Sequence, residues 1–199
     1  MPKRALLLSG GMDSIAIAYW LRPEIAFTLN YGQVAADAEV AAASAVCTAL
    51  EIEHQVLTVD CSDIGSGDLS GRDALDLAPK SDWWPFRNQM LVTLCGMAAL
   101  SKGVSEIWVG SVKNDGYHKD GGEDFYQLLS QLMSSQEGGL TVTAPAIHLT
   151  TTELIKKSAV PDELLMWAHS CHKSNTPCCN CRGCNKYFSV LAELGISGD

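Results

Sequence analysis

The fold of this chain follows from one stretch, Leu6-Leu7-Leu8-Ser9-Gly10-Gly11-Met12-Asp13-Ser14. The apolar residues 5–8 predict a buried strand, and residues 15–21 predict a helix that follows it directly. Two adjacent glycines between them allow a tight turn with positive φ and let a ligand approach the backbone. The first N–H groups of a helix have no internal partners and carry partial positive charge, so this turn suits a phosphate group.

The side chains of this turn also fit a phosphate ligand. Ser9 and Ser14 can donate hydroxyl hydrogen bonds to phosphate oxygens, and Asp13 can hold Mg²⁺. The turn lacks the lysine of the GxxxxGK[ST] loop, and its adjacent glycines distinguish it from GxGxxG. An ordinary strand-to-helix turn, with glycine for geometry and Ser or Asp as helix caps, is the alternative. The chemistry of the loop alone leaves both interpretations open.

Length and composition predict an ordinary globular protein. With 199 residues, 47% of them hydrophobic and 19% charged, the chain fits a single domain over residues 1–199. The net charge of −9 argues against sequence-independent binding of nucleic acid, which needs a dense basic surface. A small anionic substrate is compatible with this charge, because nearby cations and helix ends set the field of a pocket.

The sequence predicts neither a membrane protein nor a secreted one. No apolar segment reaches the roughly 18–20 residues that a membrane-spanning helix needs. The start, Met1-Pro2-Lys3-Arg4-Ala5, leads directly into the first predicted strand and contains no secretory signal. A cytoplasmic location is therefore expected.

Strands and helices alternate along the chain. The predicted strands are Ala5–Leu8, Ile25–Asn30, His54–Val59, Glu106–Val109 and Thr141–Ala144. The predicted helices are Ile15–Leu21, Asp37–Leu50, Gln89–Leu100, Glu123–Gln136, Thr151–Ser158, Asp162–His169 and Lys186–Leu194. This alternation predicts a Rossmann-like α/β fold, a parallel sheet with helices on both faces and ligands at the carboxyl ends of the strands. Residues 61–82 and 110–122 are polar and predict long loops.

Five of the eight cysteines lie between residues 171 and 184, and in a reducing compartment such clustering indicates a metal site. Cys178, Cys181 and Cys184 form overlapping C-x-x-C pairs, and Cys171 can supply a fourth thiolate. Four thiolates favour a closed, structural Zn²⁺ site within a segment at residues 169–186. Binding of the metal would then contribute to the folding of that segment.

Other ligand sets stay open from the sequence. Cys179 could replace Cys178, and His169 or His172 could replace Cys171. An iron–sulfur cluster also suits four cysteines, but nothing else in the sequence indicates redox chemistry, so zinc is favoured. The remaining thiols are interpreted as unreactive, the first and last of them on apolar helix faces: Cys47, Cys61 and Cys95.

Taken together, these features resemble the 7-cyano-7-deazaguanine synthase (QueC, ExsB) family of PP-loop ATP pyrophosphatases, over nearly the whole chain. Ser-Gly-Gly-x-Asp-Ser alone is similar to the pyrophosphate loop of the superfamily. The family resemblance depends on further motifs: Tyr31-Gly32-Gln33 with Glu39 downstream, Pro85-Phe86-Arg87-Asn88, the loop Gly110–Asp120, Thr143-Ala144-Pro145, and Ser170-Cys171 with Pro177-Cys178-x-x-Cys181-x-x-Cys184.

The resemblance implies an adenine nucleotide α-hydrolase-like fold and an enzyme that makes a nitrile from 7-carboxy-7-deazaguanine with ATP and ammonia. A carboxylate is a poor acyl donor because its leaving group would be oxide or hydroxide, whereas adenylation makes AMP the leaving group. Ammonia then gives the amide, and a second activation permits loss of the amide oxygen. No covalent protein nucleophile is needed. The implied cofactors are ATP, Mg²⁺ and Zn²⁺, and the implied assembly is a homodimer.

The resemblance also implies roles for individual residues. The phosphate loop would bind pyrophosphate and Mg²⁺ through Leu8, Ser9, Gly10, Gly11, Met12, Asp13 and Ser14, with Asp13 and Ser14 catalytic. Arg87 would also be catalytic and would face phosphate or the substrate carboxylate, which its planar fork suits, and Asn88 would help to bind ATP. The base-like substrate would contact Tyr31, Gln33, Arg87, Asp115, Tyr117 and Asp120. The zinc ligands would be Cys171, Cys178, Cys181 and Cys184.

Structural alternatives accompany two of these assignments. Arg87 could form an ordinary surface ion pair at the start of a helix. For Asp115, Tyr117 and Asp120, the sequence alone favours a solvated loop with turn-forming Asp and Gly.

The chain departs from the family pattern at several basic positions. Val34-Ala35 stands where the family has Arg-His, and Thr151-Thr152-Glu153 lacks the family's lysine. The loop near Tyr117 is shorter, with Asp120-Gly121-Gly122 in place of Asp-Cys-Arg. These departures leave the substrate open.

Two alternative functions follow. The first is a diverged PP-loop ligase that transfers the same adenylated acid to another amine, including one on a protein. A short, acidic chain would suit a subunit bound to a protein partner. The second is a catalytically idle, zinc-stabilised binding protein, against which the intact phosphate loop argues.

Overall fold

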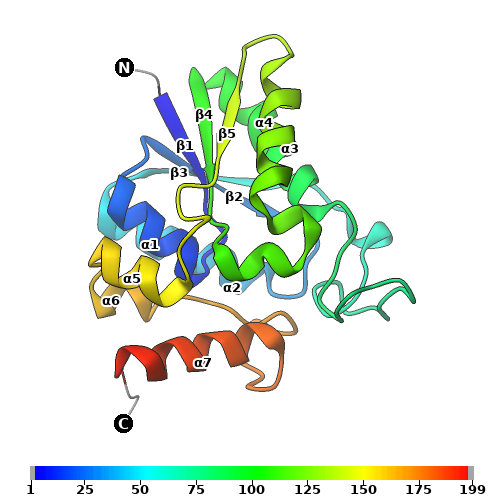
Figure 1. Ribbon diagram of the computed structural model, residues 1–199, viewed down its shortest axis with the longest axis vertical. Helices are drawn as coiled ribbons and strands as arrows, with labels where there is room; N and C mark the ends of the chain where they lie inside the picture. The colour runs from blue at the N-terminus through cyan, green and yellow to red at the C-terminus, as the bar shows by residue number, and fades with distance from the viewer. Residues whose placement is uncertain (1–2, 197–199) are drawn as a thin grey trace.

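Five parallel strands form the central sheet of the computed structural model, which describes residues 3–196 (Figure 1). The strands are β1 (Lys3–Leu7), β2 (Ile25–Asn30), β3 (Glu53–Thr58), β4 (Val104–Val109) and β5 (Thr141–Thr143). Their order in the sheet is β3-β2-β1-β4-β5. The chain thus builds outward from β1 to β3 and then crosses to the other side of β1. In such a sheet, the crevice between the diverging strands is the usual place for a ligand.

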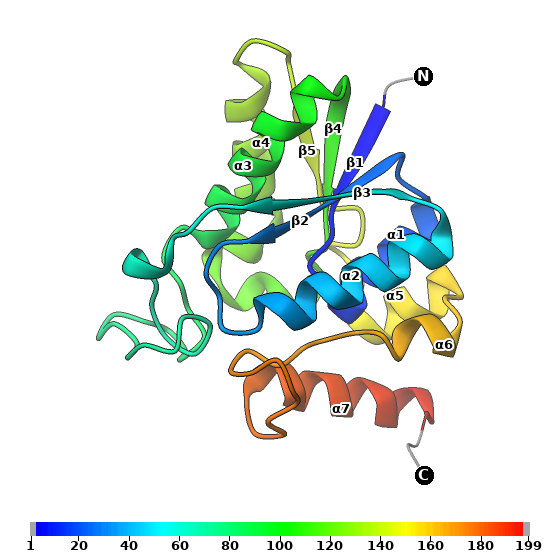
Figure 2. The same ribbon diagram turned by 180° about the vertical axis from the view of Figure 1, so that it is seen from behind.

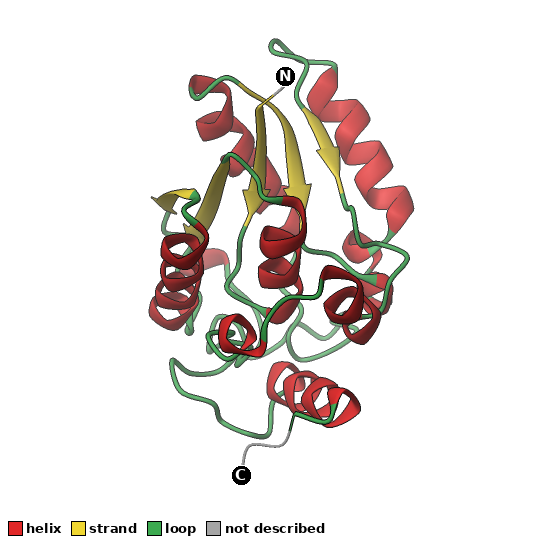
Figure 3. Cartoon of the chain, turned by 90° about the vertical axis from the view of Figure 1, so that its left-hand side faces the viewer, coloured by secondary structure: helices red, strands yellow, loops and turns green. Residues whose placement is uncertain are grey.

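Helices cover both faces of the sheet, as the sequence predicts (Figure 3). They are α1 (Met12–Leu21), α2 (Ala36–Leu50), α3 (Arg87–Ser101), α4 (Glu123–Ser134), α5 (Thr151–Ser158), α6 (Asp162–Leu165) and α7 (Arg182–Leu194). Single turns of 3₁₀ helix are η1 (Ser62–Ile64), η2 (Lys113–Tyr117) and η3 (Lys119–Gly121). None of the helices within residues 3–196 is long and apolar enough to cross a bilayer.

Side chains that alternate along the strands pack into two hydrophobic cores, one on each face of the sheet. Leu6 and Ala26 pack with α1, α2, α5 and the end of α7, whereas Ala5 and Phe27 pack with α3 and α4. This alternation is the period-2 pattern of a strand that is buried on both sides. Cys47 and Cys95 lie in these cores, where burial raises the pKa of each thiol to about 12 and so disfavours the thiolate form.

The C-terminal helix α7 lies beyond the carboxyl ends of the strands and packs against α5 (Figure 1). Figure 2 shows the segment before α7 passing beside the start of α2. There the Asn175 side-chain oxygen accepts a hydrogen bond from the Ala38 N–H at 3.1 Å. The end of the chain therefore closes over the edge of the sheet at which ligands are expected.

Six of the seven predicted helices begin or end at other residues in the structure: α1 begins at Met12, α2 begins at Ala36 and α4 ends at Ser134, and three more differ as follows. The helix predicted over 162–169 ends at Leu165, because the His169 N–H instead donates to the Gly10 carbonyl at 2.9 Å. Helix α7 begins at Arg182 rather than at Lys186, because the Cys181 side chain caps it. Helix α3 begins at Arg87, two residues before the predicted start. The two predicted polar loops contain the turns η1, η2 and η3.

The Ile107 side chain in β4 offers a test of this core. Ile107 is fully buried against α3, so Ile107→Ala is expected to lower the free energy of unfolding by about 2–5 kcal/mol, through lost burial and the cavity left behind. Urea denaturation followed by circular dichroism measures this change. Val56→Ala on β3, where the side chain is 40% exposed, is the control and should cost less than about 1 kcal/mol. Equal losses in the two variants would contradict the assigned core.

Candidate functional site

A cavity of about 310 Å³ lies at the carboxyl ends of β1, β2 and β4, and we refer to it as the central cavity. The starts of α1, α3 and α7 complete its walls. It brings together most of the residues predicted for the site: Leu8, Ser9, Gly11, Met12, Asp13, Ser14, Tyr31, Arg87, Asn88, Asp115 and Asp120. Gly10, Gln33 and Tyr117 do not line it.

The loop Ser9–Ser14, here called the glycine loop, joins β1 to α1 and depends on Gly10. Gly10 has a φ of +76°, and a Cβ atom at this position would lie 2.6 Å from the backbone oxygen of Glu39 in α2. Another residue would therefore strain the loop and push it away from α2. Gly11 is the N-cap of α1 and has no capping side chain, so the first N–H groups of the helix stay available at the cavity.

The hydroxyl groups of the glycine loop lie close together. The Ser14 hydroxyl donates to the Gly11 carbonyl at 2.9 Å, and the Ser9 and Ser14 oxygens are 3.2 Å apart. Both side chains line the central cavity beside the start of α1. Hydroxyl donors and helix N–H groups together form the environment that an anionic ligand requires.

Asp13 faces a cation inside the central cavity. Lys186 Nζ lies 2.8 Å from Asp13 Oδ2 and 3.4 Å from Asp115 Oδ1. Burial raises the pKa of Asp13, and the Lys186 ammonium opposes this effect. The other carboxylate oxygen, Asp13 Oδ1, is buried and makes no hydrogen bond within 3.5 Å among the described residues, although the nearby Thr151 hydroxyl also lowers the pKa of Asp13. An unpartnered buried carboxylate oxygen fits a hard cation such as Mg²⁺.

Gln33 does not line the central cavity but forms hydrogen bonds with residues that do. Its side-chain oxygen accepts from the Tyr31 N–H at 2.8 Å. Its side-chain nitrogen donates to the Leu29 carbonyl at 3.0 Å and to Glu39 Oε2 at 2.8 Å. Gln33 is thus a buried residue that fixes Tyr31 and Glu39, and it is Glu39 that lines the cavity. Burial raises the pKa of Glu39 to about 7, although the Gln33 hydrogen bond opposes the shift.

Aromatic side chains form another part of the wall. The Trp84 and Tyr31 rings meet edge to face with their centroids 5.1 Å apart, and both residues are almost fully buried. The neighbouring Trp83 lines the cavity and is only partly buried. These aromatic residues give the cavity an apolar side that fits a flat ring.

Arg87 and Asn88 lie at the start of α3 and line the central cavity together. Arg87 Nη2 donates to Asn88 Oδ1 at 3.1 Å, and Asn88 Nδ2 donates to the Asp120 carbonyl at 2.8 Å. The preceding Phe86 has a φ of +57°, a left-handed conformation that is uncommon for a bulky residue. Strained backbone of this kind is found where surrounding structure holds a functional residue in place.

The structure adds a partly buried charge cluster that the sequence did not predict. Asp82 Oδ2 lies 3.1 Å from Arg182 Nη1 and 3.5 Å from His172 Nδ1, and Asp82 Oδ1 lies 3.5 Å from His118 Nε2. These residues come from the loop before α3, the loop after β4, the cysteine segment and α7. The cluster joins four segments around the cavity.

The predicted site residue Tyr117 lies outside the cavity. Its side chain is 55% exposed, and the Arg182 guanidinium lies over its ring.

Three further cavity residues, Glu39, Arg182 and Lys186, were not among the predicted site residues. The sequence did hold a signal for two of them. Arg182 and Lys186 are four residues apart and flank Cys184, so a helix across this segment places both on one side.

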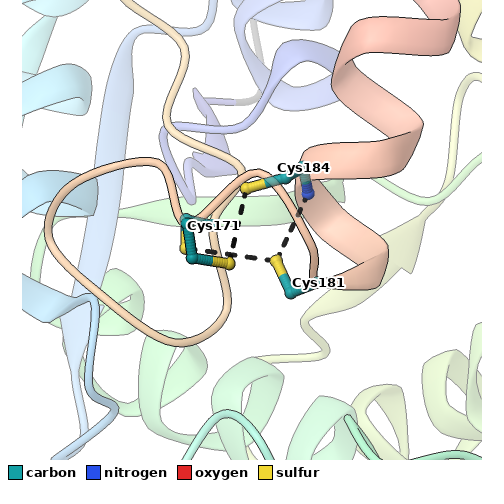
Figure 4. Close-up of side chains that lie close together, drawn as sticks. Cys171, Cys181 and Cys184 are labelled. Atoms are coloured by element: carbon teal, nitrogen blue, oxygen red, sulfur yellow. Dashed lines mark hydrogen bonds between the residues drawn. The ribbon is translucent and has the colours of Figure 1, made fainter.

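The cysteine cluster, Cys171, Cys178, Cys181 and Cys184, gathers its four sulfur atoms within 4.8 Å of one another. The Cys178 and Cys184 sulfurs are 3.9 Å apart, and those of Cys171 and Cys181 are 4.0 Å apart. Figure 4 shows Cys171, Cys181 and Cys184 converging at the start of α7. Such a group of thiols can hold a metal ion.

The alternative ligands suggested by the sequence lie elsewhere. Cys179 is exposed and lies outside the cluster. His169 Nε2 is 3.0 Å from the Ser174 carbonyl, and the His172 ring faces Asp82. The structure therefore selects the four cysteines that the family resemblance implied.

Comparison with known proteins agrees with these features. A family model described as "Queuosine biosynthesis protein QueC" matches residues 3–194. The 7-cyano-7-deazaguanine synthase of Methanosarcina mazei is 29% identical over 220 residues, which cover 98% of this chain and 95% of that protein. The synthase of Chlorobaculum parvum is 27% identical over 219 residues, covering 98% of this chain and 94% of that protein.

One solved structure shares the fold. It is the U34-tRNA thiolase NcsA from Methanococcus maripaludis with its [4Fe-4S] cluster, at a TM-score of 0.54 and 19% identity. The match covers 97% of this chain, which spans 65% of the thiolase chain. At this level of identity the likeness shows the fold alone.

Cys181 tests the cysteine cluster. Besides its place in the cluster, its sulfur accepts hydrogen bonds from the N–H groups of His172 and Cys184. Cys181→Ser is expected to lose bound metal and soluble yield, because metal ligation contributes to folding. Elemental analysis of the purified protein measures the metal. The matched control is Cys179→Ser, which removes an exposed thiol outside the cluster. Unchanged metal content in the Cys181 variant would contradict the site.

Proposed function

This chain belongs to the QueC family, and from this premise we propose that it makes 7-cyano-7-deazaguanine from 7-carboxy-7-deazaguanine, ammonia and ATP. The observation that carries the proposal is the glycine loop, which presents helix N–H groups, two hydroxyls and an unpartnered Asp13 oxygen at one cavity. Near full-length similarity to proteins named 7-cyano-7-deazaguanine synthase supports the substrate class.

ATP activation takes place at the glycine loop in this proposal. The loop N–H groups and hydroxyls hold the pyrophosphate portion of ATP, and Asp13 holds Mg²⁺ through its unpartnered oxygen. A substrate carboxylate oxygen attacks the α-phosphorus in line, an O–P bond forms, and pyrophosphate leaves. Arg87, whose guanidinium suits a carboxylate, orients the attacking group.

The acyl adenylate then reacts with ammonia. The nitrogen attacks the carbonyl carbon, a C–N bond forms, and AMP leaves with a carboxylate oxygen. A second ATP activates the amide oxygen in the same way. Loss of that oxygen with the second AMP, and of the amide protons to solvent, leaves the C≡N group. Each activation uses the same loop and cation, so one cavity serves both.

Glu39 and Trp83 are the residues we assign to the base of the substrate. The Gln33 side chain donates to Glu39 Oε2, and Glu39 lines the cavity. A carboxylate in this position accepts hydrogen bonds from the N1–H and 2-amino groups of a guanine-type ring. The partly buried face of Trp83 provides a surface against which the flat ring stacks.

The distances within the cysteine cluster support zinc as its metal. A tetrahedral ion with Zn–S bonds of about 2.3 Å has sulfurs about 3.8 Å apart, close to the 3.9 and 4.0 Å found here. A four-iron cluster binds each cysteine to a different iron atom, which separates the sulfurs more widely. We therefore propose a single Zn²⁺ held by four thiolates, with no position left for substrate.

One observation favours a second candidate. Val34 and Ala35 replace the family's Arg-His pair, and Ala35 is buried at the start of α2, so these positions bring no cation to the cavity. A PP-loop ligase that passes the adenylated acid to another amine would tolerate this change. Both candidates share the adenylation step and differ in the nitrogen nucleophile.

Product analysis distinguishes the candidates. The protein is incubated with ATP, Mg²⁺, 7-carboxy-7-deazaguanine and ammonium, and the products are identified by mass spectrometry. AMP together with the nitrile is the expected result. AMP with an amide or adenylate alone would favour the ligase, and the absence of AMP would overturn the proposed activation.

Asp13→Asn tests the cation assignment. The change keeps the shape of the side chain but removes its charge, so ATP turnover should fall by about a hundredfold or more while the protein stays folded. Release of AMP measures turnover, and circular dichroism checks the fold. The control is Asp124→Asn, on an exposed position of α4. Full activity in the Asp13 variant would refute the assigned role.

Glu39→Gln tests recognition of the base. Only the deprotonated carboxylate accepts both N–H donors, so substrate affinity should rise as the pH increases through about 7, the pKa to which burial raises Glu39. The variant should bind about 10- to 100-fold more weakly and lose this pH dependence between pH 6 and 8. Calorimetry measures both effects.

A substrate analogue serves as the control for Glu39. The analogue that lacks the 2-amino group should bind the parent protein more weakly and should discriminate less between parent and variant. Equal losses for both ligands would assign the effect to a general change in the cavity and would contradict direct recognition.

A further inference from the structure

We propose that Lys186 binds the phosphate groups of the nucleotide and that the cysteine cluster positions it for this role. The inference rests on the proposed use of ATP. It concerns residues of α7, which lie far along the chain from the glycine loop.

The cysteine cluster and the first turn of α7 form one unit. Cys181 is the N-cap of α7, and its sulfur accepts the Cys184 N–H at 3.4 Å. The same sulfur accepts the His172 N–H at 3.4 Å. Because Cys184 belongs to both the helix and the cluster, the place of the cluster sets the place of the helix start.

Close packing fixes this unit against the cavity. A Cβ atom on Gly183 would clash with the Ser170 backbone oxygen, so α7 approaches this segment as closely as only glycine permits. One residue earlier, the His169 N–H donates to the Gly10 carbonyl. The start of α7 is thus connected through residues 169–170 to the glycine loop.

Arg182 and Lys186 lie one turn apart on α7 and both line the central cavity. Arg182 contacts Asp82 and His118, whereas Lys186 contacts Asp13 and Asp115. Among the Lys and Arg residues within 3–196, Lys186 alone forms an ion pair with a side chain of the glycine loop, that of Asp13. It lies beside the position proposed for the phosphates.

The charges of the cavity explain why such a cation is needed. Five acidic residues line it, namely Asp13, Glu39, Asp82, Asp115 and Asp120, against three Lys or Arg residues, namely Arg87, Arg182 and Lys186. The glycine loop has no lysine of its own. A triphosphate in this field needs cations near it. Asp13 and Asp115 would hold Mg²⁺ when the nucleotide is bound, and Lys186 would pair with a phosphate oxygen.

Two substitutions of Lys186 test the assignment. Lys186→Met removes the charge and should weaken binding of α,β-methylene-ATP with Mg²⁺ by about 10- to 100-fold, as expected for a charged hydrogen bond. Lys186→Arg keeps the charge and should recover part of the affinity. Calorimetry measures binding, and elemental analysis should find the metal of the cysteine cluster retained in both variants.

Lys156→Met is the matched control, because it removes the same charge from an exposed position on α5. It should bind the nucleotide as the parent protein does. Parent-like affinity in Lys186→Met would overturn the inference. Loss of the metal from Lys186→Met would also overturn it, since the lysine would then act on the cluster. If the parent protein itself binds no nucleotide, the proposed function fails first, and this inference with it.

Gly183→Ala tests positioning by the cluster. The added methyl group should displace the start of α7 while all four thiols remain. Nucleotide affinity should fall as in Lys186→Met, and the double variant should show little further loss. Parent-like affinity in Gly183→Ala with normal metal content would overturn the positioning role. Should this variant fail to fold, the Lys186 variants still decide the assignment of the lysine.

Discussion

The arrangement of the central cavity depends on one backbone hydrogen bond, from the His169 N–H to the Gly10 carbonyl. It joins the turn after the first strand to the segment that leads into the cysteine cluster. The bond requires the left-handed backbone of Gly10, which turns the loop beneath α2 without a clash. It also ends the helical path of α6 and directs the chain across the strand ends. Together with the Arg182–Asp82 ion pair and the packing of Val190 and Leu191 in the core, it fixes α7 beside the cavity.

Much of the fold could be predicted from the sequence, because strands and helices leave local patterns. The apolar runs of β1 and β2 and the alanine-rich α2 are examples. The contacts that build the site are not local. Lys186 pairs with Asp13 across 173 residues, and no periodicity reports such a pair. The role of Gln33 could not be predicted from the sequence either, because only the fold shows that its amide nitrogen donates to the Glu39 carboxylate.

The departures from the family pattern take a different meaning in the structure. The sequence lacks basic residues after Tyr-Gly-Gln and before Glu153, which suggests a pocket poor in cations. The fold instead brings Arg182 and Lys186 to that pocket from α7. A residue count along the chain cannot show this, because the cations enter from a separate segment. The charge of a cavity is a property of the assembled fold.

This arrangement connects metal binding with the proposed chemistry. A metal bound by all four thiolates, as proposed, would have no open position for substrate, so it would act on the proposed reaction only through the residues that it holds. Those residues are the first turn of α7 and the segment beside the glycine loop. If a rigid metal centre restrains the backbone of α7, then Lys186 has fewer conformations before binding. Its side chain then loses less conformational entropy when it pairs with a ligand. A structural metal can therefore increase affinity for a nucleotide that it does not touch.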